Sequence, residues 1–158
     1  MKYFKMDIDH ERWMSEALKE AKLALRKGEV PVGAVVIHEN RVIGRGHNQV
    51  ELLQDPTAHA EMIAITAAAN ALENKWLLDA TLYVTVEPCS MCAGAMVLAR
   101  LKRVVYGVHD LKTGAHSSLF NLLHDPRLNH RIEVTPGVLK HDCQQLMMSF
   151  FEEVRKRN

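Results

Sequence analysis

Two short motifs in the chain contain residues whose types and spacing could bind a metal ion. One is His59-Ala60-Glu61, and the other is Pro88-Cys89-Ser90-Met91-Cys92. Zinc prefers four ligands in a tetrahedron, drawn from cysteine sulfur, histidine nitrogen and carboxylate oxygen, and a catalytic site leaves one position open. The motifs supply three ligands, His59, Cys89 and Cys92, and the third cysteine of the chain stands alone near the C-terminus. The ligand count therefore favours an open, catalytic zinc site.

The spacing within each motif predicts where it lies on a helix. Cys89 and Cys92 are three positions apart and share a helix face, and Pro88 is typical of a helix start. The positive end of the helix dipole there favours metal-binding thiolates. His59 and Glu61 are two positions apart and would point to nearly opposite sides of a regular helix. We therefore expect His59 at the very start of a helix, where the backbone is still extended.

Glu61 is the candidate for proton transfer. A zinc ion held by two thiolates and a neutral imidazole can bring the pKa of a water molecule to about 7, so hydroxide is available at neutral pH. A nearby carboxylate that is not a ligand can take the proton and pass it to a leaving group. Glu61 lies close enough to His59 in the sequence for that role.

Each motif alone leaves another interpretation open. A single CxxC motif at a helix start could equally be a redox pair, because the strand-like segment 81–86 before it would suit a thioredoxin-like fold. A lone His-x-Glu motif is weak, since most histidines are ordinary surface or core residues. The two motifs together, in this order, are much more specific for metal chemistry.

The apolar pattern predicts one α/β domain over residues 1–158. Helical and strand-like segments alternate after a first hairpin, which predicts a mixed sheet between helices. Helices are expected at 9–27, 58–73, 89–100 and 138–156, strands at 32–38, 41–48, 81–86, 103–108 and 131–134, and a loop at 49–57. Gly44 and Gly46 are expected to weaken the second strand, and residues 110–125 have no firm assignment.

Composition limits the possible partners and compartment. With 158 residues, 47% of them hydrophobic and 25% charged, the chain is typical of a soluble globular domain. No apolar run approaches the ~20 residues that a membrane helix needs, and three cysteines fit a reducing compartment, so we expect a cytoplasmic protein without a membrane partner. The net charge is only +1, which alone predicts neither RNA nor DNA as a partner.

The order His-Ala-Glu followed by Pro-Cys-x-x-Cys resembles the signature of the zinc nucleoside and nucleobase deaminases. The similarity is greatest to the bacterial tRNA-specific adenosine deaminases and extends from about residue 13 to about residue 151. It is carried by segments 29–34, 55–61, 81–85, 87–95, 110–115 and 129–131. The resemblance implies a three-layer α/β/α fold of the cytidine deaminase type, with about five strands in its central sheet.

The resemblance also implies a reaction and its residues. The reaction is hydrolytic deamination of adenosine to inosine at the wobble position of a tRNA anticodon loop, with one Zn²⁺ per chain. The implied roles are His59, Cys89 and Cys92 as metal ligands, Glu61 as the catalytic proton carrier, and Asn48 as a residue that holds the base. An amide side chain offers the donor and acceptor that a base edge needs, although asparagine is equally common in turns.

Partners follow from the same likeness. The family binds the anticodon stem-loop of tRNA in a groove built partly from the segment that matches 110–112 and from the C-terminal helix, and no DNA partner is expected. Asp110 and Arg131 are therefore candidate substrate-binding residues. Further candidates are His124, Phe150 and Phe151, although one of the two phenylalanines is expected in the core.

A homodimer is also implied. Met96, Val97 and Leu98 suit either its interface or the core. Three other functions stay open at this point. A deaminase of a small base or nucleoside, such as cytosine or guanine, would use the same zinc residues. A non-catalytic zinc module would be expected to lack Glu61, and a thiol-redox protein would need neither His59 nor Glu61.

Overall fold

A computed structural model describes residues 8–158 of the chain. In chain order the elements are α1 (His10–Arg26), β1 (Gly33–His38), β2 (Arg41–His47), α2 (Val50–Leu53), α3 (Ala60–Leu72), β3 (Thr81–Val86), α4 (Ser90–Leu98), β4 (Arg103–Val108), β5 (Glu133–Thr135) and α5 (Lys140–Arg157). Within this described range, no helix combines the length and the apolar character needed to span a membrane.

The strands form one mixed sheet in the order β2-β1-β3-β4-β5. β1 is antiparallel to both β2 and β3, whereas β4 is parallel to β3 and β5 is parallel to β4. Because β3 and β4 are parallel, the segments that follow Val86 and Val108 leave the sheet at the same edge. The predicted α/β fold with a mixed five-stranded sheet is confirmed.

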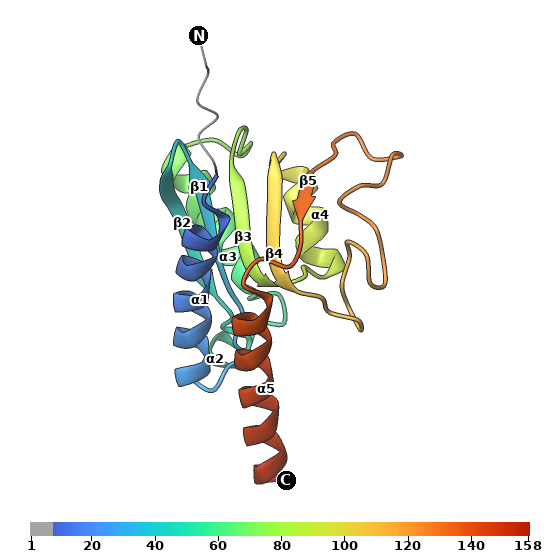
Figure 1. Cartoon of the computed structure of the whole chain (residues 1–158). Coiled ribbons are helices and arrows are strands. Elements are labelled where there is room, and N and C mark those ends of the chain that lie inside the picture. Colours follow the sequence, from blue (N-terminus) through green and yellow to red (C-terminus); the bar gives the residue numbers. More distant parts are fainter. Residues whose placement is uncertain (1–7) are drawn as a thin grey trace.

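Helices cover both faces of the sheet (Figure 1). On one face, Trp13 of α1 and Cys143 of α5 pack in a cluster with Tyr83 of β3. On the other face, Ala64 of α3 and Met96 of α4 belong to a larger apolar cluster that reaches β1, β3 and β4. The three layers expected from the deaminase resemblance are therefore present.

α1 shows how the sequence produces the outer layer. The Asp9 carboxylate accepts a hydrogen bond of 3.0 Å from the Arg12 backbone N–H, which satisfies a donor of the first turn. Trp13 and Ala17 recur at helical spacing and are buried against the sheet. The helix ends before Gly28, whose φ of +76° is left-handed and is adopted by glycine without strain.

Gly44 and Gly46 allow α3 to lie unusually close to β2. A Cβ atom on Gly44 would collide with the backbone of Ala64 and Ala68, and one on Gly46 would collide with the backbone of Ala60. β2 still pairs with β1 along its length, with one register shift. These glycines therefore permit close packing under the helix whose first turn carries Glu61.

Several element ends differ from the sequence predictions. α2 lies inside the segment 49–57 that was predicted as a loop. β5 covers Glu133–Thr135 instead of 131–134, and α4 covers Ser90–Leu98 instead of 89–100. Four-residue helices and three-residue strands are too short for a hydrophobic period to locate them.

α5 extends beyond the edge of the sheet, with its C-terminal end farthest from the body of the domain (Figure 1). Cys143 is its only buried residue. Met148 and Phe151 are 49% and 45% exposed. Among residues 8–158, the C-terminal half of α5 therefore has no apolar layer to pack against.

Candidate metal centre and substrate pocket

His59 lies at the N-cap of α3, with extended backbone angles of φ −76° and ψ 151°. The predicted position at a helix start is confirmed, and this backbone lets His59 and Glu61 serve the same cavity. The turn before it is closed by Asp55, whose carboxylate accepts hydrogen bonds from the Thr57 N–H at 2.8 Å and the Thr57 hydroxyl at 2.7 Å. His59 is therefore presented by a short, internally bonded turn.

Cys89 and Cys92 lie at the start of α4. Cys89 is the N-cap, with φ −73° and ψ 174°, and Cys92 is in the first turn. Cys92 is buried and Cys89 is half-buried. Both sulfur atoms therefore lie near the positive end of the helix dipole, which favours their thiolate forms.

The three side chains converge. His59 Nδ1 lies 3.6 Å from Cys89 Sγ and 3.5 Å from Cys92 Sγ, and all three candidate ligand atoms lie within 4.8 Å of one another. Tetrahedral zinc, with Zn–N of ~2.05 Å and Zn–S of ~2.3 Å, separates its nitrogen and sulfur ligands by about 3.6 Å. The donor set and its spacing therefore fit a tetrahedral metal ion with one position left open.

The two thiols differ in acidity before a metal binds. A hydrogen bond from Cys92 lowers the pKa of Cys89 to about 4, and the His59 ring acts in the same direction. That same hydrogen bond, together with burial, raises the pKa of Cys92. At neutral pH the pair holds one thiolate and one thiol, so a metal ion must displace the Cys92 proton.

Glu61 is buried and lines the same cavity, but it does not belong to the three-ligand group. Burial is the main cause that raises the pKa of Glu61 to about 7, and the negative charge at Cys89 acts in the same direction. A carboxyl group with such a pKa can accept and donate a proton at neutral pH. His59, Glu61 and Cys89 line the bottom of the cavity, and the buried Cys92 lies 3.5 Å from His59 Nδ1. We call these four residues the floor.

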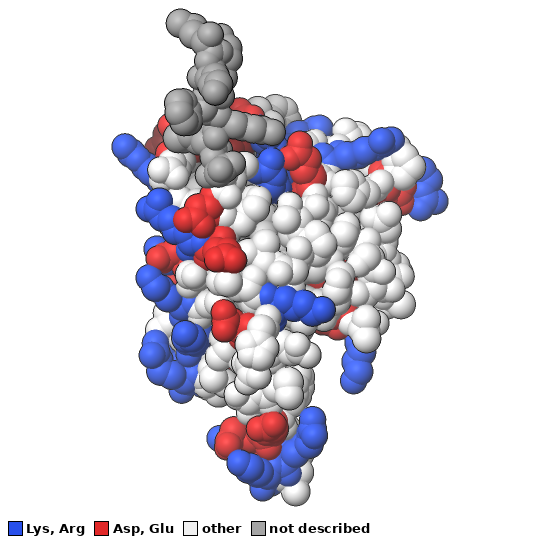
Figure 2. Space-filling model, viewed as in Figure 1, with Lys and Arg blue, Asp and Glu red and all other residues white. Residues whose placement is uncertain are grey.

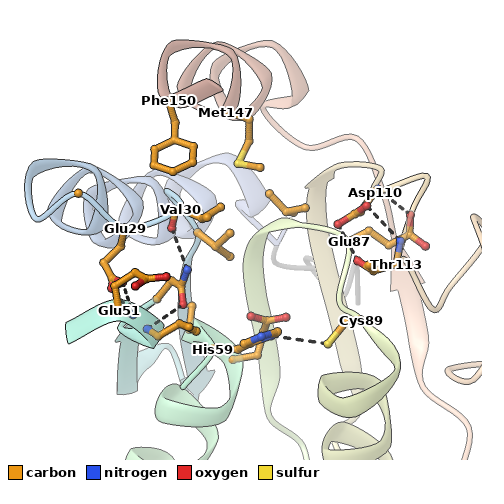
Figure 3. A pocket seen from close by; sticks show the side chains of 17 residues that line it. Glu29, Val30, Glu51, His59, Glu87, Cys89, Asp110, Thr113, Met147 and Phe150 are labelled. Atoms are coloured by element: carbon orange, nitrogen blue, oxygen red, sulfur yellow. Dashed lines mark hydrogen bonds between the residues drawn. The ribbon is translucent and has the colours of Figure 1, made fainter. Parts of the chain in front are cut away.

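The cavity above the floor has a volume of about 470 Å³. Asp110 and Thr113 lie on one side of it, and Met147 and Phe150 of α5 lie opposite His59 and Cys89 (Figure 3). Asp110, Thr113, Met147 and Phe150 form the rim. The volume is within the range of about 300–1,000 Å³ that is typical of small-molecule sites, so it admits one nucleoside and not a folded RNA.

Asn48 lines the cavity and is hydrogen-bonded to Val30, which lies across the cavity from Asp110 (Figure 3). The Asn48 side chain is held at both ends. Its Nδ2 donates to the Val30 carbonyl at 3.3 Å, and its Oδ1 accepts from the Val50 N–H at 3.3 Å. A primary amide has two donor hydrogens and two acceptor lone pairs, so one of each stays free. The wall therefore orients Asn48 and leaves it able to bind the edge of a base.

Glu29 supports this wall, a role that the sequence does not predict. Its buried carboxylate accepts hydrogen bonds from the Glu51 N–H at 2.6 Å and the Leu52 N–H at 3.4 Å. These donors belong to α2, which begins at Val50, the partner of Asn48. The one available sequence signal was the place of Glu29 in the similar segment 29–34.

Glu87 supports the opposite wall and was also missed. Its side chain is fully buried, directly before Pro88 and Cys89. Burial alone would raise its pKa, but hydrogen bonds from the Ser118 hydroxyl and from backbone N–H groups outweigh burial and lower the pKa to about 2. Glu87 is therefore a buried anion at neutral pH, held by the chain around it.

Residues 8–155 match the MafB19-like deaminase family. A tRNA-specific adenosine deaminase from Bacillus subtilis (strain 168) is 50% identical over 147 residues, which cover 93% of this chain and 91% of that protein. The chain belongs to the tRNA-specific adenosine deaminase family.

Solved structures agree with membership of the tRNA-specific adenosine deaminase family. One, from a study of A-to-I editing by tRNA:A34 deaminases at the wobble position, is 41% identical, covers 85% of this chain and 98% of that chain, and has a TM-score of 0.82. A guanine deaminase from Bacillus subtilis is 32% identical, covers 80% and 83% of the two chains, and has a TM-score of 0.62. The tRNA deaminase structure is thus more similar in both sequence and fold.

The RNA contacts expected of a tRNA-specific adenosine deaminase are divided between two places. Asp110 and Phe150 line the cavity. Arg131 and His124 are exposed and do not line it. Arg131 precedes β5, whose first residue pairs with the first residue of β4, so Arg131 lies at the edge of the sheet opposite Asp110.

The prediction that either Phe150 or Phe151 lies in the core is wrong. Phe150 is half-buried and lines the cavity, and Phe151 is 45% exposed. The two rings pack edge to face, with centroids 5.3 Å apart. Neither ring is buried because this part of α5 extends past the sheet.

Proposed function

We propose that this protein catalyses the hydrolytic deamination of adenosine to inosine at the wobble position of a tRNA anticodon loop. One observation carries the proposal. A group of three candidate metal ligands lies at one nucleoside-sized cavity, which His59, Cys89 and the buried carboxyl group of Glu61 line, in a chain of the tRNA-specific adenosine deaminase family.

One zinc ion per chain is the proposed cofactor. His59, Cys89 and Cys92 would hold it, because their donor types and their separations of 3.5 and 3.6 Å suit a tetrahedral ion. When bound, zinc acts as a Lewis acid and makes hydroxide available near neutral pH.

Glu61 carries the protons of the reaction. A C6–O bond forms as water adds to the purine, and the C6–N6 bond breaks as ammonia leaves. Glu61 takes one proton from the incoming water and delivers it to ring N1. It then takes the second proton from the new C6 hydroxyl group and delivers it to the departing amino group. A pKa of about 7 allows Glu61 to accept and to donate at the same pH.

Asn48 is the proposed contact to the base edge, and Asp110 and Arg131 are proposed contacts to the RNA. Because the cavity holds only about 470 Å³, the target nucleotide must leave its stack and enter alone. An anticodon loop is already single-stranded, so the free-energy cost of unstacking is small.

The proposed partner is the anticodon stem-loop of tRNA. Figure 2 shows that Lys and Arg gather along α1 and at the end of α5, with Asp and Glu among them. Arg155 and Arg157 are exposed on α5 beyond Phe150, where phosphates next to the target nucleotide could reach them. So few basic side chains predict a modest dependence of binding on salt concentration.

A homodimer is proposed as the assembly. Met96 and Val97 are buried in the core, but Leu98 is 79% exposed. Leu119 and Phe120 are also 56% and 49% exposed, and a second chain that covered these side chains would remove apolar surface from water. Light scattering tests this: twice the chain mass of 17.9 kDa supports the dimer, and a single chain mass contradicts it.

The proposed domain and compartment follow from the site. A single domain over residues 1–158 contains every candidate site residue. The cytoplasm is the proposed location, because it supplies tRNA and keeps thiolate ligands reduced.

The function can be tested with zinc-loaded protein and an RNA stem-loop that carries adenosine at the wobble position. Free adenosine, cytidine and guanine run in parallel, with products scored by mass spectrometry. Inosine from the stem-loop alone is expected. Turnover of a free base or nucleoside, with the RNA unchanged, would contradict the tRNA substrate while keeping the deaminase chemistry.

A further inference from the structure

Glu87 occupies a position between the floor and the rim. It follows β3, and it precedes Pro88 and the candidate ligand Cys89. Its side chain is completely buried, and it is not a member of the three-ligand group. A buried carboxylate is unfavourable unless hydrogen bonds compensate the loss of water.

The compensating donors all come from one loop, residues 109–118. Backbone N–H groups donate to the carboxylate from Asp110 at 3.1 Å, His116 at 3.0 Å, Ser117 at 3.1 Å and Ser118 at 3.3 Å. The Ser118 hydroxyl donates as well, and the His109 ring nitrogen Nδ1 lies 3.3 Å from the carboxylate. One anion therefore holds both ends of a loop that has no regular hydrogen-bond ladder of its own.

The backbone fixes this loop against the metal-binding segment. Cys89 and Gly114 form an isolated antiparallel bridge, and the Ala115 N–H donates to the Pro88 carbonyl at 2.8 Å. A Cβ atom on Gly114 would collide with the Glu87 carboxylate, so glycine is needed for the carboxylate to fit. The loop is thus held in register with the segment that carries the ligand.

The loop carries half of the rim. The Asp110 carboxylate accepts hydrogen bonds from the Lys112 N–H at 3.1 Å, the Thr113 N–H at 3.2 Å and the Thr113 hydroxyl at 2.8 Å. Asp110 and Thr113 therefore form one rigid turn at the cavity wall, beside Glu87 (Figure 3).

We infer that Glu87 is a positioning residue that sets the distance between the Asp110–Thr113 turn and the metal centre. Glu87 borders the cavity, but its side chain is buried and both of its carboxylate oxygens accept hydrogen bonds from the loop, so it acts on the substrate through that turn. The inference rests on the proposed deamination of a tRNA anticodon loop. The competing interpretation is that Glu87 stabilises the fold without any particular effect on the rim.

A double-mutant cycle separates the two interpretations. Glu87→Gln keeps the shape of the side chain but replaces one acceptor oxygen with a donor, which cannot accept the loop N–H groups. We expect kcat/KM on the stem-loop to fall on the order of 100-fold, mainly through KM, as for a displacement of about 1 Å. Zinc content should stay at one ion per chain.

The decisive comparison uses Asp110→Ala and, as the matched control, Asn48→Ala on the opposite wall. If Glu87 acts through the Asp110 turn, Glu87→Gln combined with Asp110→Ala should be no worse than the more severe single variant. Glu87→Gln combined with Asn48→Ala should instead show the product of the two single effects. Multiplied effects in both pairs would overturn the inference, as would a Glu87→Gln variant with unchanged KM.

If Glu87→Gln loses zinc or misfolds, a milder variant takes its place in the experiment. Ser118→Ala removes one donor to the carboxylate and leaves the anion in place. The same two pairings with Asp110→Ala and Asn48→Ala then decide the inference by the same criterion. If the wild-type protein does not deaminate the stem-loop, the proposed function is wrong. If the wild-type protein is active but the effects on kcat/KM multiply in both pairs of substitutions, only the inference about Glu87 is wrong.

Discussion

The floor and the rim of the pocket are built in different ways. The floor residues lie at the starts of α3 and α4, two helices that pack on one face of the sheet. The rim comes from the loop 109–118 and from α5, whose C-terminal half extends past the sheet. The floor therefore inherits its geometry from regular backbone, whereas the rim depends on side chains that tie irregular segments in place.

This difference separates chemistry from recognition. Helix starts bring the ligand atoms together, with His59 Nδ1 3.6 Å from Cys89 Sγ and 3.5 Å from Cys92 Sγ. The rim presents a carboxylate turn and a half-buried aromatic ring, which suit contacts to an extended RNA strand. Substitutions in the floor should therefore change kcat or metal content, and substitutions in the rim should change KM.

The largest expected effect is the loss of a floor ligand. Cys92→Ala removes a buried candidate metal ligand, so we expect loss of zinc, no detectable turnover and a lower melting temperature. Metal analysis, activity and thermal unfolding check the three outcomes. A variant that keeps one zinc per chain would show that Cys92 is not a ligand and that the floor is assembled differently.

Next in size is the loss of the floor carboxylate. Glu61→Gln should keep zinc and fold, while kcat falls by about 10²- to 10⁴-fold with little change in KM, because only proton transfer is removed. Steady-state kinetics on the stem-loop, with metal content as the control, measure this. A variant that retains most of its rate would contradict the assignment of Glu61 as the proton carrier.

The pH dependence of metal binding tests the floor without a substitution. Since the pKa of Cys92 is raised, its thiol is protonated at neutral pH and must lose that proton when zinc binds. Zinc affinity should therefore rise by about tenfold per pH unit for each proton released. Calorimetry in two buffers of different ionisation enthalpy counts the protons, and a count of zero would contradict a protonated Cys92.

A rim aromatic should give a smaller effect of a different kind. Phe150→Ala should raise KM by roughly 5- to 100-fold, the effect of losing one stacked base, with kcat nearly unchanged. Phe151→Ala is the matched control on the same helix, because Phe151 does not line the cavity. If the two substitutions changed KM equally, or if only kcat changed, the assignment of recognition to the rim would be contradicted.

Arg131 should give the smallest effect. It lies at the end of the sheet away from the rim, so, as the loss of a single exposed contact to the RNA, Arg131→Gln should lower kcat/KM on the stem-loop by only about twofold, and an unchanged value would contradict the contact. A larger loss, accompanied by a weaker salt dependence, would show that the RNA extends around the sheet edge. Until then, contact between Arg131 and RNA stays a prediction.

The sequence predicts the floor well because its determinants are local. The His59 position at a helix start follows from its two-residue spacing to Glu61, and the CxxC motif defines the start of α4. Hydrophobic periods of 2 and 3.6 residues likewise locate β1 to β4 and the four long helices. These features need only residues that are close together in the chain.

The rim and its supports were not predictable in the same way. α2 depends on Glu29, 22 residues before Glu51, and the order of the loop at 116–118 depends on Glu87, about 30 residues earlier. Neither bond leaves a periodic signal. The positions of Phe150 and Phe151 were misjudged because an apolar helix pattern does not reveal where the sheet beneath it ends.

Gly44 and Gly46 restrict how this scaffold can diversify. Because β2 and α3 touch without room for a methyl group, a larger residue on the strand would lift the helix whose N-cap is His59. A larger residue at either glycine would fit only if the position of α3, which carries the facing Ala60, Ala64 and Ala68, changed as well. Substitutions in the rim, one side chain at a time, would therefore change substrate preference while the metal centre keeps its geometry.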